Sequence, residues 1–385
     1  MSKWEWKKLE DCIERVKYTT KIPSKDYLQE GEFPIVSQED CLISGYWNDR
    51  SDLFKVTKPI VIFGDHTKVL KYIDFDFVLG ADGVKILCPK DYLNAHFFFY
   101  FLKSVNFDNL GYARHYRLLK ELSVPIPPLS EQKRIVKFLD EEFSKIDTLK
   151  TNAETNLKNA KELFETTLEK ELNPPLRHSE HSEESSAKLP SGWEWRTLGD
   201  VCEKISDGSH NPPKGTAANE YKMLSSKNIF NDSLNFDDPR FLTKEEFDLE
   251  NKRTNVKKGD ILLTIVGTIG RCCVFLEDEP VVFQRSVAVL KPNISLVYSR
   301  FLMYGIIALN IEKLGRGAAQ KGVYLKQLSN ISIPLPPLSV QKEIVARLDK
   351  LSENVKRLEA NYKQIIANCD ELKKSILKKT FEGES

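Results

Sequence analysis

Residues 125–136 read PIPPLSEQKRIV, and residues 334–345 repeat this stretch as PLPPLSVQKEIV. A second repeat opens each half of the chain, where WEW at residues 4–6 returns at residues 193–195. The copies are 209 residues apart for the proline-rich stretch and 189 residues apart for the opening, a difference of 20. The sequence therefore predicts two related halves, with the extra residues inside the second half.

A long helix is predicted after each proline-rich stretch. Proline cannot continue a helix, and Ser130 and Ser339 are suited to cap a helix that starts there. In the second helix, apolar residues recur at alternating steps of four and three, which is typical of a coiled coil. In the first helix the steps average nearer 3.67 residues, so its apolar stripe is looser and still needs a partner. Burial of each stripe on its own globule is the alternative, but two stripes of matching length bury each other most economically. The residues assigned to packing between the helices are Ile146, Leu149, Leu348, Leu351, Val355, Leu358 and Ile365.

Outside these helices, short β-branched and aromatic runs end at turn residues and predict strands, as in residues 58–63, 260–266 and 280–290. Residues 92–104 and 297–314 are predicted to form helices that lie on the sheets. The predicted fold class is α+β, with two globular domains in a pseudo-twofold arrangement, separated by two long antiparallel coiled-coil helices. The expected boundaries are a first domain at 1–127, a first helix at 128–172, a flexible polar linker at 173–190, a second domain at 191–336 and a second helix at 337–380.

Composition narrows the function classes. The 385 residues include 57 Lys and Arg against 56 Asp and Glu, so the net charge of +1 gives no argument for a polyanionic partner. The apolar runs are far shorter than the roughly 18 residues that a membrane span needs, so no membrane partner is expected. The opening residues have no apolar core typical of a secretory signal, and the seven cysteines are scattered. A cytoplasmic location is therefore expected.

The familiar catalytic motifs are missing from the sequence. It contains no GxxxxGK[ST] loop, no HExxH and no CxxC, which argues against a nucleotide motor, a zinc hydrolase and a redox pair. The stretches NPPK at 211–214 and NPPL at 173–176 echo a loop of amino-methyltransferases, but neither has the aromatic residue that stacks on a flipped base. We expect no catalytic residue and no metal site.

The arrangement of two diverged globules, each followed by PxPPLSxQKxIV, resembles the specificity subunit of type I restriction-modification systems. The resemblance covers the whole chain and includes GDHT at 64–67, GTIGR at 267–271 and FQRS at 283–286. It implies a non-catalytic subunit whose globules are target-recognition domains, each reading one half of a split, asymmetric sequence in double-stranded DNA. It also implies that the helices carry two modification subunits, that restriction subunits join them, and that S-adenosylmethionine, ATP and Mg²⁺ belong to these partners.

Under this interpretation, base edges and phosphates are contacted by polar side chains on turns beside the strands. Arg can pair with guanine and Gln with adenine through two hydrogen bonds. The candidates in the first domain are His66, Thr67, Lys68, Lys71, Arg114, His115, Tyr116 and Arg117. The candidates in the second domain are Ser209, His210, Lys214, Thr268, Arg271, Gln284, Arg285, Arg316, Gln320 and Lys321.

Two other functions remain open at this point. The first is a coiled-coil assembly adaptor whose globules bind proteins; it predicts no preference among DNA sequences. The second is a self-sufficient methyltransferase, which predicts that the purified chain binds S-adenosylmethionine.

Overall fold

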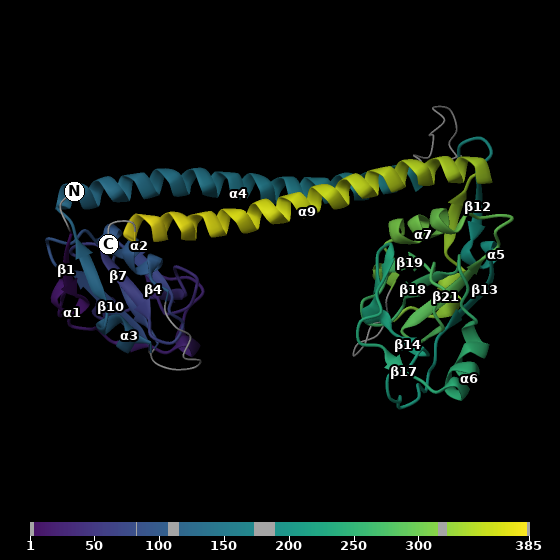
Figure 1. The fold of residues 1–385 in the computed structure, drawn as a ribbon, viewed down its shortest axis with the longest axis horizontal. Helices are drawn as coiled ribbons and strands as arrows, with labels where there is room; N and C mark the ends of the chain where they lie inside the picture. Colours follow the sequence, from purple (N-terminus) through teal and green to yellow (C-terminus); the bar gives the residue numbers. More distant parts are fainter. Residues whose placement is uncertain (1–3, 82, 107–114, 173–188, 315–321, 383–385) are drawn as a thin grey trace. The chain divides into compact units, whose positions relative to one another are not determined.

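The computed structural model describes residues 4–81, 83–106, 115–172, 189–314 and 322–382, so the linker expected at 173–190 lies almost entirely outside the described residues. The chain forms two compact units (Figure 1). Unit 1 comprises Met1–Asn156 and Asn361–Ser385, and unit 2 comprises Leu157–Ala360. Two long helices, α4 (Leu129–Leu172) and α9 (Leu338–Glu382), each contribute one part to unit 1 and the other part to unit 2.

Unit 1 contains two main sheets and a strand pair. The first sheet is antiparallel, in the order β2-β10-β7-β8, and the second has the order β3-β9-β4-β5 with β6 also on β9. A separate antiparallel pair, β1 with β11, joins the two ends of the globule. The elements are β1 (Glu5–Lys8), α1 (Leu9–Cys12), β2 (Ile13–Glu14), β3 (Lys21–Ile22), β4 (Phe33–Val36), β5 (Gly45–Trp47), β6 (Leu53–Phe54), β7 (Ile60–Gly64), β8 (Leu70–Ile73), β9 (Phe77–Gly80), β10 (Val84–Pro89), α2 (Ala95–Ser104), α3 (Tyr116–Lys120) and β11 (Ser123–Ile126).

Unit 2 repeats this plan. Its four-stranded sheet has the order β13-β21-β18-β19, and β12 pairs with β22 as β1 pairs with β11. The elements are β12 (Glu194–Thr197), α5 (Leu198–Val201), β13 (Cys202–Asp207), β14 (Lys222–Leu224), β15 (Ile229–Phe230), β16 (Ser233–Leu234), β17 (Arg240–Phe241), α6 (Lys244–Thr254), β18 (Ile261–Thr264), β19 (Cys272–Val274), β20 (Val281–Phe283), β21 (Val287–Pro292), α7 (Ser299–Ala308), α8 (Leu325–Ser329) and β22 (Ser332–Leu335).

The four-stranded sheets of the two units match strand for strand, whereas the second sheet of unit 2 has the order β17-β14-β20 and β15 pairs separately with β16. The second sheet of each unit contains a parallel strand pair, β4 with β9 in unit 1 and β14 with β20 in unit 2. Within the described residues, α6 has no counterpart in unit 1, and it lies in the part of the second half where the repeat offsets placed extra residues. The structure thus confirms the α+β fold class, with two sheet-rich units and two long helices.

Each four-stranded sheet is covered by the helix that follows its last strand, α2 after β10 and α7 after β21. All five residues of β7 and all four of β18 are buried, as expected for central strands packed on both faces. The helix α2 begins where the Asn94 side chain accepts hydrogen bonds from the backbone N–H groups of His96 and Phe97. Its buried aromatic residues then share a core with the start of α4 and the end of α9. In unit 2, α7 shares a core with the start of α9 and the end of α4.

The glutamine of the first proline-rich stretch, Gln132, acts as a clamp and holds backbone groups of two segments from a buried position. Gln132 is fully buried, and its Oε1 accepts a hydrogen bond from the Asn94 N–H at 2.7 Å. Its Nε2 donates to the carbonyl oxygens of Tyr92 at 2.9 Å and Pro127 at 2.8 Å. One side chain therefore ties the start of α4 to the segment that leads into α2.

Gln341 makes the same three hydrogen bonds in unit 2. Its Oε1 accepts from the Tyr298 N–H at 2.8 Å, and its Nε2 donates to the carbonyl oxygens of Leu296 at 3.0 Å and Pro336 at 2.8 Å. The helices begin at Leu129 and Leu338, so the serines predicted as caps lie inside the first turn. The repeated motif is thus explained by the glutamine clamp.

Inside each unit, α4 and α9 run antiparallel. In unit 1, Lys150 Nζ lies 2.7 Å from Asp370 Oδ1, and Lys373 pairs with Asp147, so increasing numbers on one helix meet decreasing numbers on the other. In unit 2, Arg347 Nη2 lies 2.6 Å from Glu171 Oε2.

The buried stripe between these helices differs in part from the predicted one. Ile146, Leu348 and Val355 are buried, and Leu351 and Ile365 are half-buried. Leu149 and Leu358, in contrast, are 51% and 39% exposed, so their assignment to the stripe is wrong. The heptad spacing places the neighbouring residues Lys150 and Glu359 on the stripe, where both are half-buried. A charged side chain can occupy such a position because its aliphatic stem packs while its head group reaches the edge.

Candidate nucleic-acid interface

The turn between β7 and β8 carries three of the candidates of unit 1. Thr67 is exposed, and its hydroxyl donates to the carbonyl oxygen of Gln38 at 2.6 Å. The backbone N–H of the half-buried His66 donates to Gln38 Oε1 at 3.2 Å. Lys68 adopts a left-handed backbone with φ of 61°. Gln38 thus holds the shape of a turn that presents Thr67 and Lys68.

Lys71 is a correction to the predicted set. It is only 5% exposed, and its Nζ donates to the carbonyl oxygens of Ser37 at 2.9 Å and Cys41 at 2.5 Å. Burial lowers the pKa of Lys71. Strand alternation explains the difference: Lys71 lies opposite Ile62 in β8 and points to the buried side. It supports the segment after β4, so its prediction as a DNA contact is wrong.

The second cluster of unit 1 lies against the first. His115 donates its backbone N–H to the Asp65 carbonyl oxygen at 2.8 Å, and the Tyr116 N–H donates to Asp65 Oδ1 at 2.8 Å. His115 is 1% exposed, with Nδ1 3.0 Å from the same carbonyl oxygen, so it cannot contact DNA as predicted. Tyr116 is half-buried beneath Lys85, and Arg117 is exposed. Arg114 lies outside the described residues.

In unit 2, the segment after β13 contains a buried and an exposed candidate. Ser209 is 5% exposed; its N–H donates to the Phe283 carbonyl oxygen at 2.8 Å, and its own carbonyl oxygen accepts from the Arg285 N–H at 2.9 Å. It therefore fastens this segment to the end of β20, and its prediction as a DNA contact is wrong. The exposed His210 has its Nε2 2.6 Å from Asp207 Oδ2.

Asp207 is the anchor of this segment. Burial opposes ionisation of its carboxyl, but hydrogen bonds from Arg253 and His210 outweigh burial and hold the pKa of Asp207 below its usual range. The carboxylate is therefore charged near neutral pH and orients the His210 ring.

The remaining described candidates of unit 2 lie on turns. Thr268 is exposed and Arg271 half-buried between β18 and β19, and the Arg271 guanidinium lies 5.1 Å from the centre of the Phe230 ring. Both line an open pocket of about 810 Å³. Arg285 is exposed between β20 and β21. Arg316, Gln320 and Lys321 lie outside the described residues.

Gln284 and Lys214 lie together in a cleft of about 440 Å³ beside β14, β17 and β20. The same cleft is lined by Lys227 and Arg240, which the sequence analysis missed. These residues come from four separate segments, and the pairing of β14 with both β17 and β20 assembles them. No local sequence signal marked the two missed cations, because their meeting depends on strand order.

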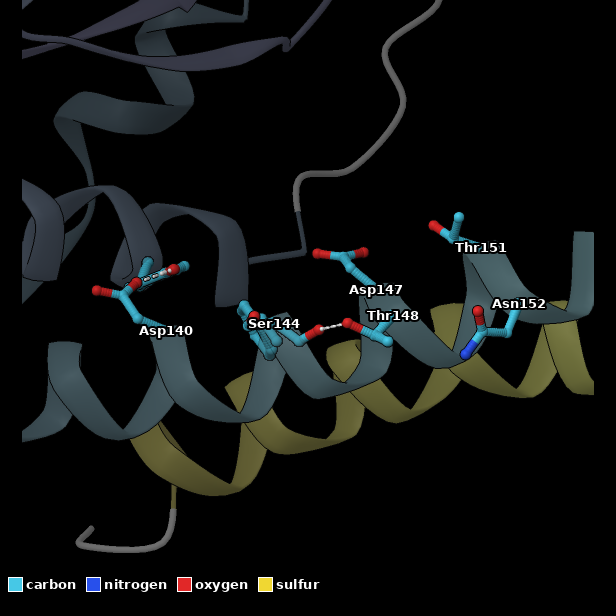
Figure 2. Close-up of a pocket in the computed structure, with 8 residues that line it drawn as sticks. Asp140, Ser144, Asp147, Thr148, Thr151 and Asn152 are labelled. Carbon is cyan, nitrogen blue, oxygen red and sulfur yellow. Dashed lines mark hydrogen bonds between the residues drawn. The ribbon is translucent and has the colours of Figure 1, made fainter. Parts of the chain in front are cut away.

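Another pocket, of about 550 Å³, lies on α4 in unit 1 and has a different character. Figure 2 shows Asp140, Ser144, Asp147, Thr148, Thr151 and Asn152 along one side of the helix. The Tyr100 hydroxyl donates to Asp140 Oδ1 at 2.6 Å. Burial of the Tyr100 ring together with the hydrogen bond to Asp140 raises the pKa of the phenol, so Tyr100 keeps its proton. Two carboxylates, with no basic residue among the described lining, make this pocket a poor site for DNA phosphates.

The described residues also bear on metal binding and on membrane insertion. No group of three or more His, Cys, Asp and Glu side chains in this part of the chain is arranged to hold a metal ion. No helix among these residues is both long and apolar enough to cross a membrane.

Comparison with known proteins gives consistent matches across the chain. A family model described as type I restriction modification DNA specificity domain matches residues 1–159 and 190–367. The specificity subunit of type I restriction enzyme EcoBI from Escherichia coli is 26% identical over 361 residues, which covers 88% of this chain and 75% of the relative. The MjaVIII specificity subunit from Methanocaldococcus jannaschii is 23% identical over 408 residues, 99% of this chain and 92% of the relative.

Two solved structures share the fold. One comes from work on complex assembly and conformational transition of the type I R-M system; it has a TM-score of 0.73 at 21% identity and covers 100% of this chain and 98% of its own. The HsdS subunit from Thermoanaerobacter tengcongensis has a TM-score of 0.53 at 21% identity, with coverage of 99% and 97%. Since the family model accounts for most of the chain in two matching segments, this protein belongs to the family of type I restriction-modification specificity subunits.

Proposed function

We propose that this chain is a non-catalytic subunit that reads a split, asymmetric sequence in double-stranded DNA, with one half-site per unit. The observation that carries the proposal is the duplicated scaffold with different surface residues. Both units have the same core sheet order, yet the turn after β7 presents Thr67 and Lys68 while the turn after β18 presents Thr268 and Arg271. One scaffold with two sets of polar side chains suits the reading of two different sequences.

The helices would carry the partners. Exposed leucines recur on them at an offset of 209 residues: Leu149 and Leu163 on α4 correspond to Leu358 and Leu372 on α9. The ion pairs of unit 1 set residues 147–150 opposite 370–373, so Leu149 and Leu372 lie on facing turns. Exposed apolar patches mark protein interfaces, and a repeated patch suits two copies of one partner. We assign these patches to two modification subunits.

The remaining steps belong to partners under this proposal. S-adenosylmethionine would bind to the modification subunits, and ATP and Mg²⁺ would serve the restriction subunits that complete the complex. The chain would then act in the cytoplasm, where the DNA is.

Fluorescence anisotropy with labelled duplexes tests the DNA-reading role. The full chain in complex with modification subunits should bind one split sequence about a thousandfold or more tighter than unrelated duplexes. Equal affinity for all duplexes would favour a protein-binding adaptor. Calorimetry with S-adenosylmethionine and the chain alone should give no binding heat; saturable binding would support a self-sufficient methyltransferase instead.

Substitution of an exposed leucine pair tests the docking role. The double variant L149E/L372E should fold normally, with a change in unfolding free energy of about 0.5 kcal/mol or less, because both side chains are exposed. Binding of one modification subunit should be lost while the other remains, which native mass spectrometry can count. Leu348→Glu is the control for a buried position and should unfold unit 2. Retention of two modification subunits by the double variant would contradict this docking surface.

A further inference from the structure

The cleft of unit 2 combines the groups needed to read a base. Its lining includes the side-chain amide of Gln284, the cations of Lys214, Lys227 and Arg240, and the apolar side chain of Met223. At about 440 Å³ it has the size of a small-ligand site. Cations suit a phosphate backbone, and an amide suits a base edge.

Gln284 is held from two sides through its backbone. Its N–H donates to the Leu224 carbonyl oxygen at 2.9 Å, and the residue forms a parallel bridge with Ser209. The segment that contains Ser209 can lie this close to the end of β20 because residue 208 is a glycine. A Cβ at Gly208 would overlap the Phe283 carbonyl oxygen. Among the described residues, no group forms a hydrogen bond with the Gln284 side-chain amide. A rigid backbone therefore presents an unengaged amide to the cleft.

The cations differ in how firmly they are held. Arg240 donates a hydrogen bond from Nη1 to the Pro213 carbonyl oxygen, which supports the segment of Lys214. Lys227 pairs with the exposed carboxylate of Asp238, and both side chains remain more than half exposed. Lys214 is exposed. Lys214 and Lys227 are thus the rim cations that can reach phosphate, with Asp238 as the local counter-charge that DNA must displace.

The position of unit 1 that matches Gln284 carries no amide. The register of β4 with β9 and of β14 with β20 makes Gly80 the counterpart of Gln284. A Cβ at Gly80 would lie 2.5 Å from Tyr27 Oη, which itself accepts a hydrogen bond from the Ala81 N–H at 2.9 Å. Tyr27 therefore fills the space that the amide occupies in unit 2, and the two units differ in chemistry at matching positions.

From this geometry we infer that the Gln284 cleft is the adenine-reading site of unit 2, with Lys214 and Lys227 on the flanking phosphates. The inference rests on the proposed function. Gln284 Nε2 donates to adenine N7, and Gln284 Oε1 accepts from the adenine N6 amino group. The Met223 side chain lines the same cleft and is apolar, while Thr216 and Ser225 add hydroxyl groups to the lining.

The contact between Gln284 and adenine N7 is tested by combining the Gln284 variant with 7-deazaadenine, a base that lacks the N7 acceptor. The complex of the full chain with modification subunits is titrated with unmethylated duplexes that contain the motif it methylates. In each duplex, 7-deazaadenine replaces one adenine of the half-site assigned to unit 2. For the wild type, one replacement should weaken binding about five- to tenfold. Gln284→Ala should bind the natural site roughly five- to hundredfold more weakly and show no further loss at that adenine. Gln364→Ala, on an exposed face of α9, is the matched control and should retain the full loss.

The outcomes separate this inference from the proposed function. If Gln284→Ala keeps the wild-type penalty at every adenine, the adenine assignment is overturned while DNA reading stands. If the wild-type complex shows no sequence preference, the proposed function itself fails. Gln284→Glu is a second variant and should shift preference at that position toward cytosine, whose N4 amino group donates to a carboxylate. Thermal melting of each variant shows whether it is folded.

The proposed phosphate contacts of Lys214 and Lys227 are tested separately, by the salt dependence of DNA binding. Lys214→Gln and Lys227→Gln should each weaken binding to all duplexes alike and lower the slope of log affinity against log salt by about 1. Lys258→Gln, whose side chain pairs with Asp278 outside the cleft, should leave the slope unchanged. Unchanged slopes for both cleft variants would contradict phosphate contact at this rim.

Discussion

Replacing residues 191–336 by the second recognition domain of another family member changes one half of the methylated motif and leaves the other half as it was. The exchange includes both strands of the β12 and β22 pair, because Trp195 lies opposite Pro334 in that pairing. A cut before β22 would leave β12 without its partner. Since each unit has its own sheets and core, loss of one set of reading side chains should not disturb the other.

Sequencing of modified bases in cells that express the hybrid gives the measurement. The reciprocal exchange of residues 1–127 serves as the control and should change the opposite half. Alteration of both halves by a single exchange would show that the units do not read independently. Loss of all methylation would be interpretable only with the thermal unfolding curve of the hybrid, which should keep the transition of unit 1.

Gln341→Leu lowers the free energy of unfolding of unit 2 by about 3 kcal/mol or more. The leucine is of similar size but leaves the Tyr298 N–H and the carbonyl oxygens of Leu296 and Pro336 without their partner. Each buried backbone group that loses its hydrogen bond costs about 1–3 kcal/mol. Urea unfolding followed by circular dichroism measures the change.

Matched substitutions sharpen this test. Gln364→Leu lies on the exposed face of the same helix and should change stability by less than about 0.5 kcal/mol. Gln132→Leu should have the large effect in unit 1, where the clamp makes the same three bonds. A small change for Gln341→Leu would mean that water or a rearranged loop replaces the amide.

The sequence was most informative where it repeats. The PIPPLSEQKRIV stretch and its copy located both helix starts, and the apolar runs located β7 and β18. The single strand predicted at 280–290 is wrong: the run contains β20 and the start of β21, which belong to different sheets. The predicted stripe is wrong by one position at Leu149 and Leu358. These leucines were assigned to the stripe because they are apolar, but the heptad spacing of the helix places the next residue there. Lys150 and Glu359 occupy those places in the stripe.

The candidate interface was predicted less well, for a reason tied to strand register. Lys71, His115 and Ser209 are residue types that suit DNA, yet alternation and backbone pairing turn them inward. Lys227 and Arg240 were missed because they meet Gln284 only through the order of strands in space. Which side of a strand a residue occupies, and which strands adjoin, are decided by pairings between distant segments.

The position of the two glutamine clamps bears on how such genes diversify. All the groups held by Gln132 lie between residues 92 and 132, and all those held by Gln341 lie between residues 296 and 341. Genetic recombination with a crossover inside α4, downstream of Gln132, would therefore pass on each clamp intact from a single parent. Hybrid offspring would keep correctly anchored helices, so new DNA specificities could arise by shuffling without compensating mutations at the anchors.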